Sequence, residues 1–342
     1  MKAVVIREHG GPGALSFEDV PDPVAGPGEV VVSVRAVGIN HLDLWVRKGV
    51  PGHVFPLPMI PGNDVAGVIE SVGAGVRNVE PGAEVVVAPG ISCGVCAACQ
   101  EGRDHHCPRY GILGETRDGG YAERIAVPCA NVMPKPANLS FEEAASMPLA
   151  FLTAWHMLTA RAKLRANETV LVQAAGSGVS SAAVQIAKLF HADVIATAGS
   201  EEKRKQALAL GADHVLDSRN PGLAKEVKAL TDGRGADIVF DHVGEATWEA
   251  STKSLAWQGR FVTCGATTGA LVNLNLSHLF FKSLSILGST MGSKGELREI
   301  LAHAERGRLK PVLARALPLG EAREAHRMLE AREVFGKLVL VP

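Results

Sequence analysis

The sequence predicts an α/β protein built from two domains, a small, partly open antiparallel β-barrel and a doubly wound parallel sheet. Three observations lead to this fold class. The chain has 342 residues, more than one hydrophobic core usually supports. Its first part consists of short β-rich runs between Gly- and Pro-rich turns, which is typical of a small barrel. From about Leu164 onward, short apolar strands alternate with helical segments, which is typical of a parallel sheet.

The barrel domain is expected to cover residues 1–150 and to be completed by the C-terminal residues 291–342. Turn clusters such as Gly26-Pro27-Gly28 and Pro81-Gly82 separate its apolar runs. The predicted strands are 2–6, 30–37, 65–72, 84–87, 124–127 and, at the end of the chain, 337–341.

The parallel-sheet domain is expected to cover residues 151–290. Its first two helices are predicted to end at Phe190 and Leu210, and a further helix, 296–306, follows the last strand. The predicted strands are 169–174, 193–197, 214–216, 237–241, 260–264 and 284–288.

Composition narrows the classes of function. The chain is 46% hydrophobic and 21% charged, like an ordinary soluble globular protein. Its net charge of -1 argues against nonspecific binding to nucleic acid or anionic lipid, because both require a basic surface. No apolar stretch approaches a membrane span, and the N-terminal apolar run is interrupted at Arg7 and Glu8. We therefore expect a cytoplasmic protein that acts on a small molecule.

A phosphate-binding turn is predicted where the strand 169–174 meets the following helix. Small residues there allow the backbone to approach a pyrophosphate, and the helix N-terminus offers free N–H groups. The last glycine of the usual fingerprint is replaced by Ser180 and Ser181, which predicts slightly looser packing of the helix on the sheet. The expected cofactor-binding residues of this turn are Ala175, Gly176, Ser177, Gly178, Val179 and Ser180.

The end of the second strand of this domain bears on the choice of cofactor. An NAD enzyme usually has an Asp or Glu about 20 residues beyond the turn. Here residues 198–200 are Ala-Gly-Ser, followed by Lys203 and Arg204. A hydroxyl at Ser200 and a cation at Lys203 suit the 2'-phosphate of NADP(H), which we favour, whereas Glu201 and Glu202 keep NAD(H) possible. Ser200 can also simply cap the next helix.

Further cofactor contacts are expected where later strands end, because open parallel sheets bind ligands along that edge. His242 lies at the same edge and is compatible with either cofactor contact or core packing. The other candidates are Val243, Gly265, Ala266, Gly288, Ser289 and Thr290.

Four of the six cysteines lie within one short segment, with the spacing Cys93-x2-Cys96-x2-Cys99-x7-Cys107. Four thiolates in one loop can close a tetrahedral zinc site, and a complete four-cysteine shell leaves no position for a substrate. We therefore expect one structural Zn²⁺ per chain, with free cytosolic thiols as the alternative.

These features, in this order, resemble the medium-chain dehydrogenase/reductase superfamily, which includes zinc alcohol dehydrogenases and quinone oxidoreductases. The resemblance implies a GroES-like barrel domain and a Rossmann domain, with the active site between them, and we expect a homodimer or homotetramer. It is carried by 28–30, 38–43, 61–67, the cysteine segment, 119–123, 152–155, the phosphate-binding turn and 336–337.

The departures from the zinc alcohol dehydrogenases concern the catalytic metal. Asn40 stands where those enzymes have a ligating Cys, and Asn63-Asp64 replaces the His-Glu that supplies further candidate ligands. Near Ala150 there is no Cys or His for the last ligand. Because a catalytic zinc needs about three strong protein ligands, we expect none here. These positions look more like quinone oxidoreductases, although most of those lack the cysteine segment.

The resemblance also implies roles for individual residues. Asn40 and Thr153 would lie beside the nicotinamide, although either could instead serve a local hydrogen bond. Asp43 is expected to support the site through a neighbour rather than act as a base. His41 and Lys337 would contact the cofactor, with a solvent-facing His41 as the alternative.

Together these observations predict an NADP(H)-preferring reductase or dehydrogenase that transfers hydride between the nicotinamide and a quinone, enone or aldehyde without a catalytic metal. Conjugated acceptors suit such a site best, because conjugation spreads the developing negative charge. A zinc-dependent alcohol dehydrogenase and a non-catalytic NADPH-binding protein are the alternatives.

Overall fold

The computed structural model describes residues 1–342 and divides into two compact units. Unit 1 comprises Met1–Leu152 together with Gly292–Pro342, and unit 2 comprises Thr153–Met291. The C-terminal segment therefore returns to the unit in which the chain begins. None of the helices combines the length and the apolar character needed to span a membrane.

Unit 1 is built on an antiparallel sheet in the order β16-β17-β3-β4-β5-β9, with β8 also paired to β3. Only the β16–β17 pair is parallel. Two smaller sheets, β1-β2 and β6-β7, accompany it. Its strands are β1 Lys2–Ile6, β2 Leu15–Asp19, β3 Glu29–Gly38, β4 Asp64–Val72, β5 Glu84–Val87, β6 Gly90–Ile91, β7 Gly111–Ile112, β8 Arg124–Pro128, β9 Val132–Pro134, β16 Leu313–Pro318 and β17 Lys337–Val341.

The long central strand β3 organises this unit. It pairs with β4, β8 and β17, and its side chains Val30, Val32 and Val34 are buried in the main apolar core. Valine suits this position because its branched side chain packs well on a pleated surface. The α-helices of the unit are α1 His41–Lys48, α2 Ala97–Gln100, α3 Phe141–Ala145, α4 Pro148–Trp155, which runs across the boundary with unit 2, α10 Lys294–Glu305 and α11 Ala322–Glu330.

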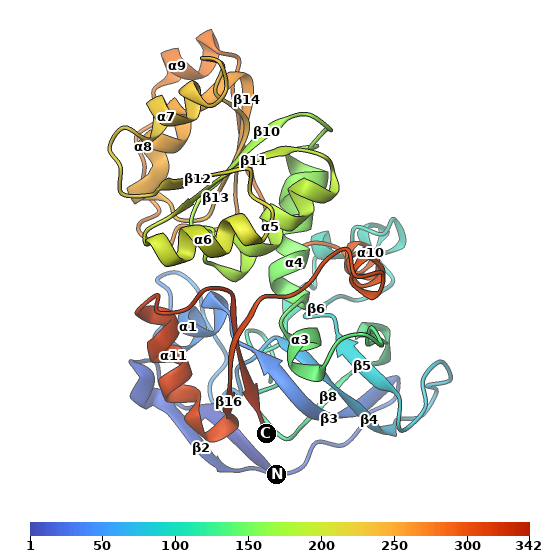
Figure 1. Ribbon diagram of the computed structural model, residues 1–342. Coiled ribbons are helices and arrows are strands. Elements are labelled where there is room, and N and C mark those ends of the chain that lie inside the picture. The colour runs from blue at the N-terminus through green and yellow to red at the C-terminus, as the bar shows by residue number, and fades with distance from the viewer. The chain divides into compact units, whose positions relative to one another are not determined.

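Unit 2 contains six parallel strands in the order β12-β11-β10-β13-β14-β15. Helices α5 and α6 cover one face and α7 and α8 the other (Figure 1). The strand order reverses between β10 and β13, the position at which doubly wound sheets bind ligands. The elements are β10 Thr169–Val172, α5 Gly178–Leu189, β11 Asp193–Ala198, α6 Glu201–Ala209, β12 His214–Asp217, α7 Leu223–Ala229, β13 Ala236–Asp241, α8 Glu245–Lys253, β14 Leu255–Thr263, α9 Leu276–Phe281 and β15 Ser285–Gly288.

The fold class predicted from the sequence is confirmed, with differences at individual strands. The strand predicted at 169–174 ends at Val172, because Ala174 adopts a φ of 52°, outside the β region. Strand β14 begins at Leu255, five residues before its predicted start at Arg260. Strands β2, β6, β7, β9 and β16 were not predicted. In β16 only Leu317 is buried, so its sequence lacks the alternation that identifies a half-buried strand.

Candidate functional site

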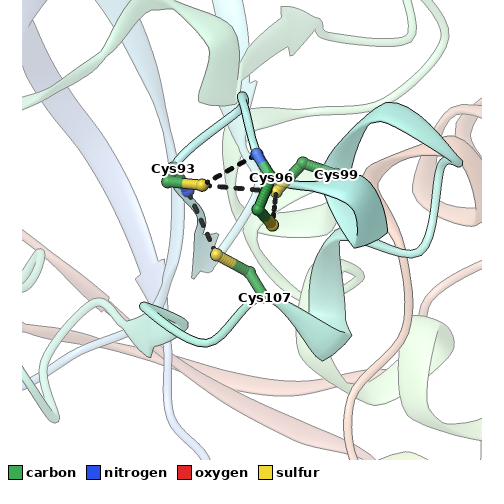
Figure 2. A group of neighbouring side chains, drawn as sticks. All are labelled: Cys93, Cys96, Cys99 and Cys107. Atoms are coloured by element: carbon green, nitrogen blue, oxygen red, sulfur yellow. Dashed lines mark hydrogen bonds between the residues drawn. The ribbon is translucent and has the colours of Figure 1, made fainter.

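The thiols of Cys93, Cys96, Cys99 and Cys107 converge on one point of unit 1 (Figure 2). Their sulfur atoms all lie within 4.8 Å of one another, and the Cys96 and Cys99 Sγ atoms are 3.5 Å apart. A tetrahedral Zn–S₄ site with bonds of about 2.3 Å requires sulfur separations of about 3.8 Å. The cluster therefore fits a structural zinc ion, which these four residues would hold without an open position.

The surrounding backbone favours the thiolate form that a metal requires. The N–H groups of Cys93 and Arg109 each lie 3.4 Å from the Cys107 Sγ, and the N–H of Cys96 lies 3.4 Å from the Cys93 Sγ. Hydrogen bonds from the backbone at Val95 and Cys96 lower the pKa of Cys93 to about 5. The backbone donors of the loop thus favour a thiolate at Cys93.

A salt bridge anchors the cysteine segment to the C-terminal part of unit 1. The Lys294 ammonium lies 2.9 Å from Asp104 Oδ2 and 2.8 Å from Ser92 Oγ, and the Lys294 N–H donates to Asp104 Oδ1. Asp104 lies between the third and fourth cysteines, and Lys294 begins α10. Folding of the cysteine segment is therefore linked to a helix far away in the sequence.

A second polar cluster, which we call the Lys337 centre, contains Asn40, Asn63, Asp64 and Lys337. All four side chains are at most 7% exposed. The Asn40 amide donates to Asn63 Oδ1 at 2.6 Å and to Asp64 Oδ2 at 2.8 Å, so both of its hydrogens are used. This arrangement leaves no Asn40 N–H for a substrate oxygen.

The ammonium of Lys337 supplies the positive charge of this centre. It donates to Ile39 O at 2.8 Å, to Asp64 Oδ2 at 3.0 Å and to the Asn40 Oδ1. Asp64 also accepts the backbone N–H of Leu149 at 2.7 Å, near the start of α4. All three ammonium hydrogens therefore have partners in unit 1. The hydrogen bonds of Lys337 in this structure are not directed at a cofactor, which is the contact expected of this residue from the sequence.

Asp43 connects the Lys337 centre to a buried chain of side chains. Its carboxylate accepts from the Asn40 N–H at 2.7 Å, and from Gly62 N–H and Asn63 Nδ2 at 3.1 Å. Burial raises the pKa of Asp43 to about 7 against the opposing effect of these donors. Asp43 thus fixes Asn63 and the backbone of Asn40, and its supporting role in the reaction stays a prediction.

Tyr121 and His326 extend this chain, and sequence reasoning did not find them. The Tyr121 hydroxyl lies 3.0 Å from His326 Nε2, and Arg47 Nη1 lies 3.2 Å from His326 Nδ1. Tyr121 also packs against Gly62, whose φ of 99° and lack of a side chain permit the close approach. Because Tyr121 and His326 are 205 residues apart, no local pattern signals their contact.

In unit 2 the predicted phosphate-binding turn lies between β10 and α5. Ser177 caps α5, and its hydroxyl accepts the Ser180 N–H at 3.0 Å. Ser180 is fully buried and donates to Gln173 O at 2.7 Å, so the serine that replaces the usual glycine ties the helix to the end of the strand. His242 Nε2 lies within 3.0 Å of both serine hydroxyls, which brings three sequence-predicted residues together.

The expected NADP(H) determinants lie at the end of β11. Ser200 caps α6 by accepting the Lys203 N–H at 3.3 Å, with Glu201 and Glu202 in the first turn, which confirms the capping interpretation. The carboxylate at the end of the neighbouring strand, Asp217, is paired with two arginines. Its Oδ2 lies 3.3 Å from Arg204 and 3.1 Å from Arg219, and hydrogen bonding to Arg219 lowers its pKa to about 2.

The remaining candidates lie just beyond β13, β14 and β15. The Ser289 N–H donates to Thr263 O at 2.9 Å, yet its buried hydroxyl has no hydrogen-bond partner. A buried unpaired hydroxyl at this edge fits a cofactor polar group.

Of the other predicted residues, Thr153 is buried in α4 and His41 begins α1. The rest are Val243, which follows β13, Gly265 and Ala266, which follow β14, and Gly288 and Thr290, at and after the end of β15.

Comparisons with known proteins agree with this architecture. Residues 26–137 match the family model of the alcohol dehydrogenase GroES-like domain, and residues 178–306 match that of the zinc-binding dehydrogenase. A crystal structure titled NAD-dependent alcohol dehydrogenase is 54% identical, with a TM-score of 0.97 and 100% of each chain covered.

Two curated relatives span the same length. The NAD-dependent alcohol dehydrogenase of Sulfolobus acidocaldarius is 35% identical and covers 99% of each chain. The quinone oxidoreductase of Pseudomonas aeruginosa is 31% identical, covering 100% of this chain and 99% of its own. With the two-domain fold, the nucleotide-type turn and the four-thiol cluster, these matches show that the chain belongs to the medium-chain dehydrogenase/reductase superfamily and is an oxidoreductase of that type.

Proposed function

We propose that this chain is an NADPH-preferring reductase of a small carbonyl compound, a quinone, an enone or an aldehyde, and that it works without a catalytic metal. The nicotinamide supplies or accepts the hydride. The contribution of the protein is to bind the dinucleotide and to hold the acceptor against it in a site that excludes water.

The Lys337 centre is the observation that carries the proposal. Asn40, Asn63 and Asp64 hold the positions that the sequence relates to catalytic zinc ligands, and the Lys337 ammonium already neutralises Asp64 there. A neutral amide binds zinc far more weakly than a thiolate or imidazole, and the fixed ammonium repels a cation. These residues do not fit a catalytic zinc ion. A conjugated acceptor suits the site because its developing negative charge is delocalised.

The roles proposed for the candidate residues follow from their contacts. Asn40 and Asp43 are positioning residues, since each acts through neighbours within the Lys337 centre. Thr153 and His41 remain proposed contacts of the nicotinamide and the pyrophosphate. Lys337 acts by its charge on Asn40 and Asp64.

The proposed preference for NADPH rests on the end of β11. No carboxylate is present at residues 198–200, and Asp217 on the adjacent strand is neutralised by Arg204 and Arg219. Ser200 and Lys203 supply a hydroxyl and a cation for the 2'-phosphate. The names of two relatives specify NAD, and the selectivity measurement below decides between the cofactors for this chain.

A steady-state screen tests the proposed reaction. Purified protein is assayed with NADPH and NADH against quinones, enones and aldehydes, and with NADP⁺ and NAD⁺ against simple alcohols. We expect the highest kcat/KM with a conjugated acceptor, and no loss of activity when a chelator is added under conditions that leave the cysteine site loaded. Preferred turnover of ethanol, or inactivation by the chelator with the cysteine zinc retained, would favour a zinc alcohol dehydrogenase. No turnover of any acceptor would favour a non-catalytic NADPH-binding protein.

Cofactor selectivity is tested at Lys203. If its ammonium contacts the 2'-phosphate, Lys203→Ala should lower the NADPH/NADH ratio of kcat/KM about tenfold, which corresponds to about 1.4 kcal/mol. Lys205→Ala on the same helix is the matched control, since Lys205 pairs with Glu201 at 2.8 Å on the exposed surface. Equal use of both cofactors by the wild type would contradict the preference.

We also propose a homodimer formed through the edge of the unit 2 sheet. Strand β15 is the last strand, and exposed apolar side chains gather on and near it, including Ile286 at 39%, Phe280 at 63% and Phe281 at 67% exposed. Such an edge can pair with its equivalent in a second copy. Light scattering should give a dimer, or a tetramer made of two such dimers, for the wild type and a smaller species for Ile286→Asp. An unchanged mass for the variant would contradict this interface.

A cytoplasmic location is proposed as well, because none of the six cysteines forms a disulfide, as is usual in a reducing compartment.

A further inference from the structure

The phosphate-binding turn contains a small network of side-chain hydrogen bonds. It consists of Ser177 and Ser180 at the start of α5 and His242 directly after β13. Strands β10 and β13 are neighbours in the sheet, with Val172 opposite Phe240, and the Gln173 N–H donates to Phe240 O at 3.0 Å. This pairing places His242 beside the turn.

The hydrogen bonds of Ser180 determine which ring nitrogen of His242 carries the proton. A hydroxyl has one hydrogen, and Ser180 donates it to Gln173 O at 2.7 Å. Toward His242 Nε2, at 3.0 Å, Ser180 can therefore only accept. The Nε2 atom must carry a hydrogen. Burial lowers the pKa of His242, which favours the neutral ring and hence a single tautomer.

Counting donors and acceptors in the same way leaves the hydroxyl hydrogen of Ser177 without an acceptor inside the turn. The Ser177 oxygen accepts the Ser180 N–H at 3.0 Å and lies 2.9 Å from His242 Nε2, which is a donor. Both neighbours thus donate to Ser177. Its own hydrogen is free to point out of the turn, and Ser177 is partly exposed.

We propose that His242 is a positioning residue for the cofactor: its Nε2–H holds the Ser177 hydroxyl so that the hydroxyl hydrogen donates to the pyrophosphate of the nicotinamide dinucleotide. This inference rests on the proposed cofactor site at the turn. Ser180 has a part in it as well, because the hydroxyl that replaces the usual glycine is the acceptor that fixes the tautomer of His242.

Direct binding measurements test the proposal without relying on turnover. Dissociation constants of NADPH and of ADP-ribose, which share the pyrophosphate, are measured by calorimetry for wild type, Ser177→Ala, His242→Phe and the double variant. We expect each single variant to bind both ligands about tenfold more weakly, the effect of losing one charge-assisted hydrogen bond. In the double variant the two losses should not add, because His242 acts through Ser177.

Two further variants and one kinetic readout distinguish a positioning role of His242 from a purely structural one. His242→Gln retains an amide donor at the place of Nε2 and should restore most of the affinity. Ser181→Ala is the matched control, since the Ser181 hydroxyl donates to Gly178 O at 2.9 Å within the same helix. His242→Phe leaves the helix cap of Ser177 intact, so kcat at saturating NADPH should stay within twofold of wild type while KM for NADPH rises.

The outcomes are distinct. Wild-type affinity in His242→Phe, or additive losses in the double variant, would overturn the role of His242. Absence of NADPH and NADH binding by the wild type would instead overturn the proposed cofactor site itself.

Discussion

Both polar clusters of unit 1 contain negatively charged side chains that a positive charge must balance, but the source of that positive charge differs. The four thiols near Cys93 converge on one point, and their negative charge in the thiolate form calls for an external cation. The Lys337 centre contains an acid, Asp64, whose charge is matched by an ammonium of the same chain. One cluster is completed by a metal ion and the other by the protein alone.

This difference has a simple cause in the sequence. Soft thiolates select zinc, whereas two amides and a carboxylate with a lysine between them make a closed set of donors and acceptors. A metal ion in such a centre would have to displace the lysine and break its three hydrogen bonds. The charge of the neighbours, more than the geometry of the cluster, therefore decides whether a metal is part of the site.

The largest effect is expected from breaking the thiol cluster. Cys107→Ser removes one of four ligands from a closed zinc shell, for which binding energies of about 10–16 kcal/mol are typical in small zinc domains. We expect the zinc content to fall from one ion per chain toward none and the thermal transition to shift down by several degrees. Metal analysis and calorimetry measure both.

Cys129→Ser is the matched control for this prediction. The Cys129 Sγ lies outside the cluster, 2.7 Å from Asn78 Oδ1, so this variant should keep its zinc. A wild-type protein purified with zinc present that nevertheless contains none would show that the first cluster is not a metal site.

The Lys337 centre should be sensitive to removal of its internal cation. Lys337→Met leaves Asp64 buried without a counter-charge, and loss of one partner of a buried pair typically costs about 3–5 kcal/mol. Urea unfolding should show this loss as a lower midpoint, with zinc content unchanged.

The double variant Lys337→Met/Asp64→Asn tests whether the loss of stability comes from the unpaired charge. It removes both charges while an amide oxygen remains for the Leu149 N–H, so most of the lost stability should return. If the double variant is as unstable as Lys337→Met, the lysine contributes by packing rather than by charge.

The smallest effect is expected from Asn40→Ala. This change removes one hydrogen bond each from Lys337, Asn63 and Asp64, a cost of about 1–3 kcal/mol, and leaves the Lys337–Asp64 ion pair in place. Because we assign Asn40 a positioning role in the reaction, kcat should fall more than KM for the acceptor rises. Unchanged kcat in a folded variant would limit Asn40 to a structural role.

The sequence predicted the parts of the fold that rest on local pattern. The apolar runs at β1, β5 and β17 have their predicted bounds, and the turn proposed to bind phosphate precedes α5 as expected. The edge strand β16 was missed because only one of its side chains faces a core, and an exposed strand carries no hydrophobic period.

The two polar clusters differ in the same way: one follows from a local sequence pattern and the other does not. The thiol cluster comes from one short segment, so spacing alone identified it. The partners of Asn40 could not be found in this way, since Lys337 is 297 residues away and becomes a neighbour only because β17 pairs with β3. Resemblance to a family drew attention to both residues, but the direction of each hydrogen bond required coordinates.

The short β6–β7 ladder makes the cysteine segment separable from the barrel. Ile91 pairs with Gly111 in antiparallel register, so the chain enters and leaves the segment through adjacent backbone positions. Closing such a gap with a short turn costs little chain entropy. Excision of residues 92–110 and insertion of a two-residue hairpin should therefore give a chain whose barrel folds in zinc-free medium, with the loss of the Asp104 anchor of Lys294 as the main penalty. The metal requirement of this enzyme would then be a property of an insert, and removable with it.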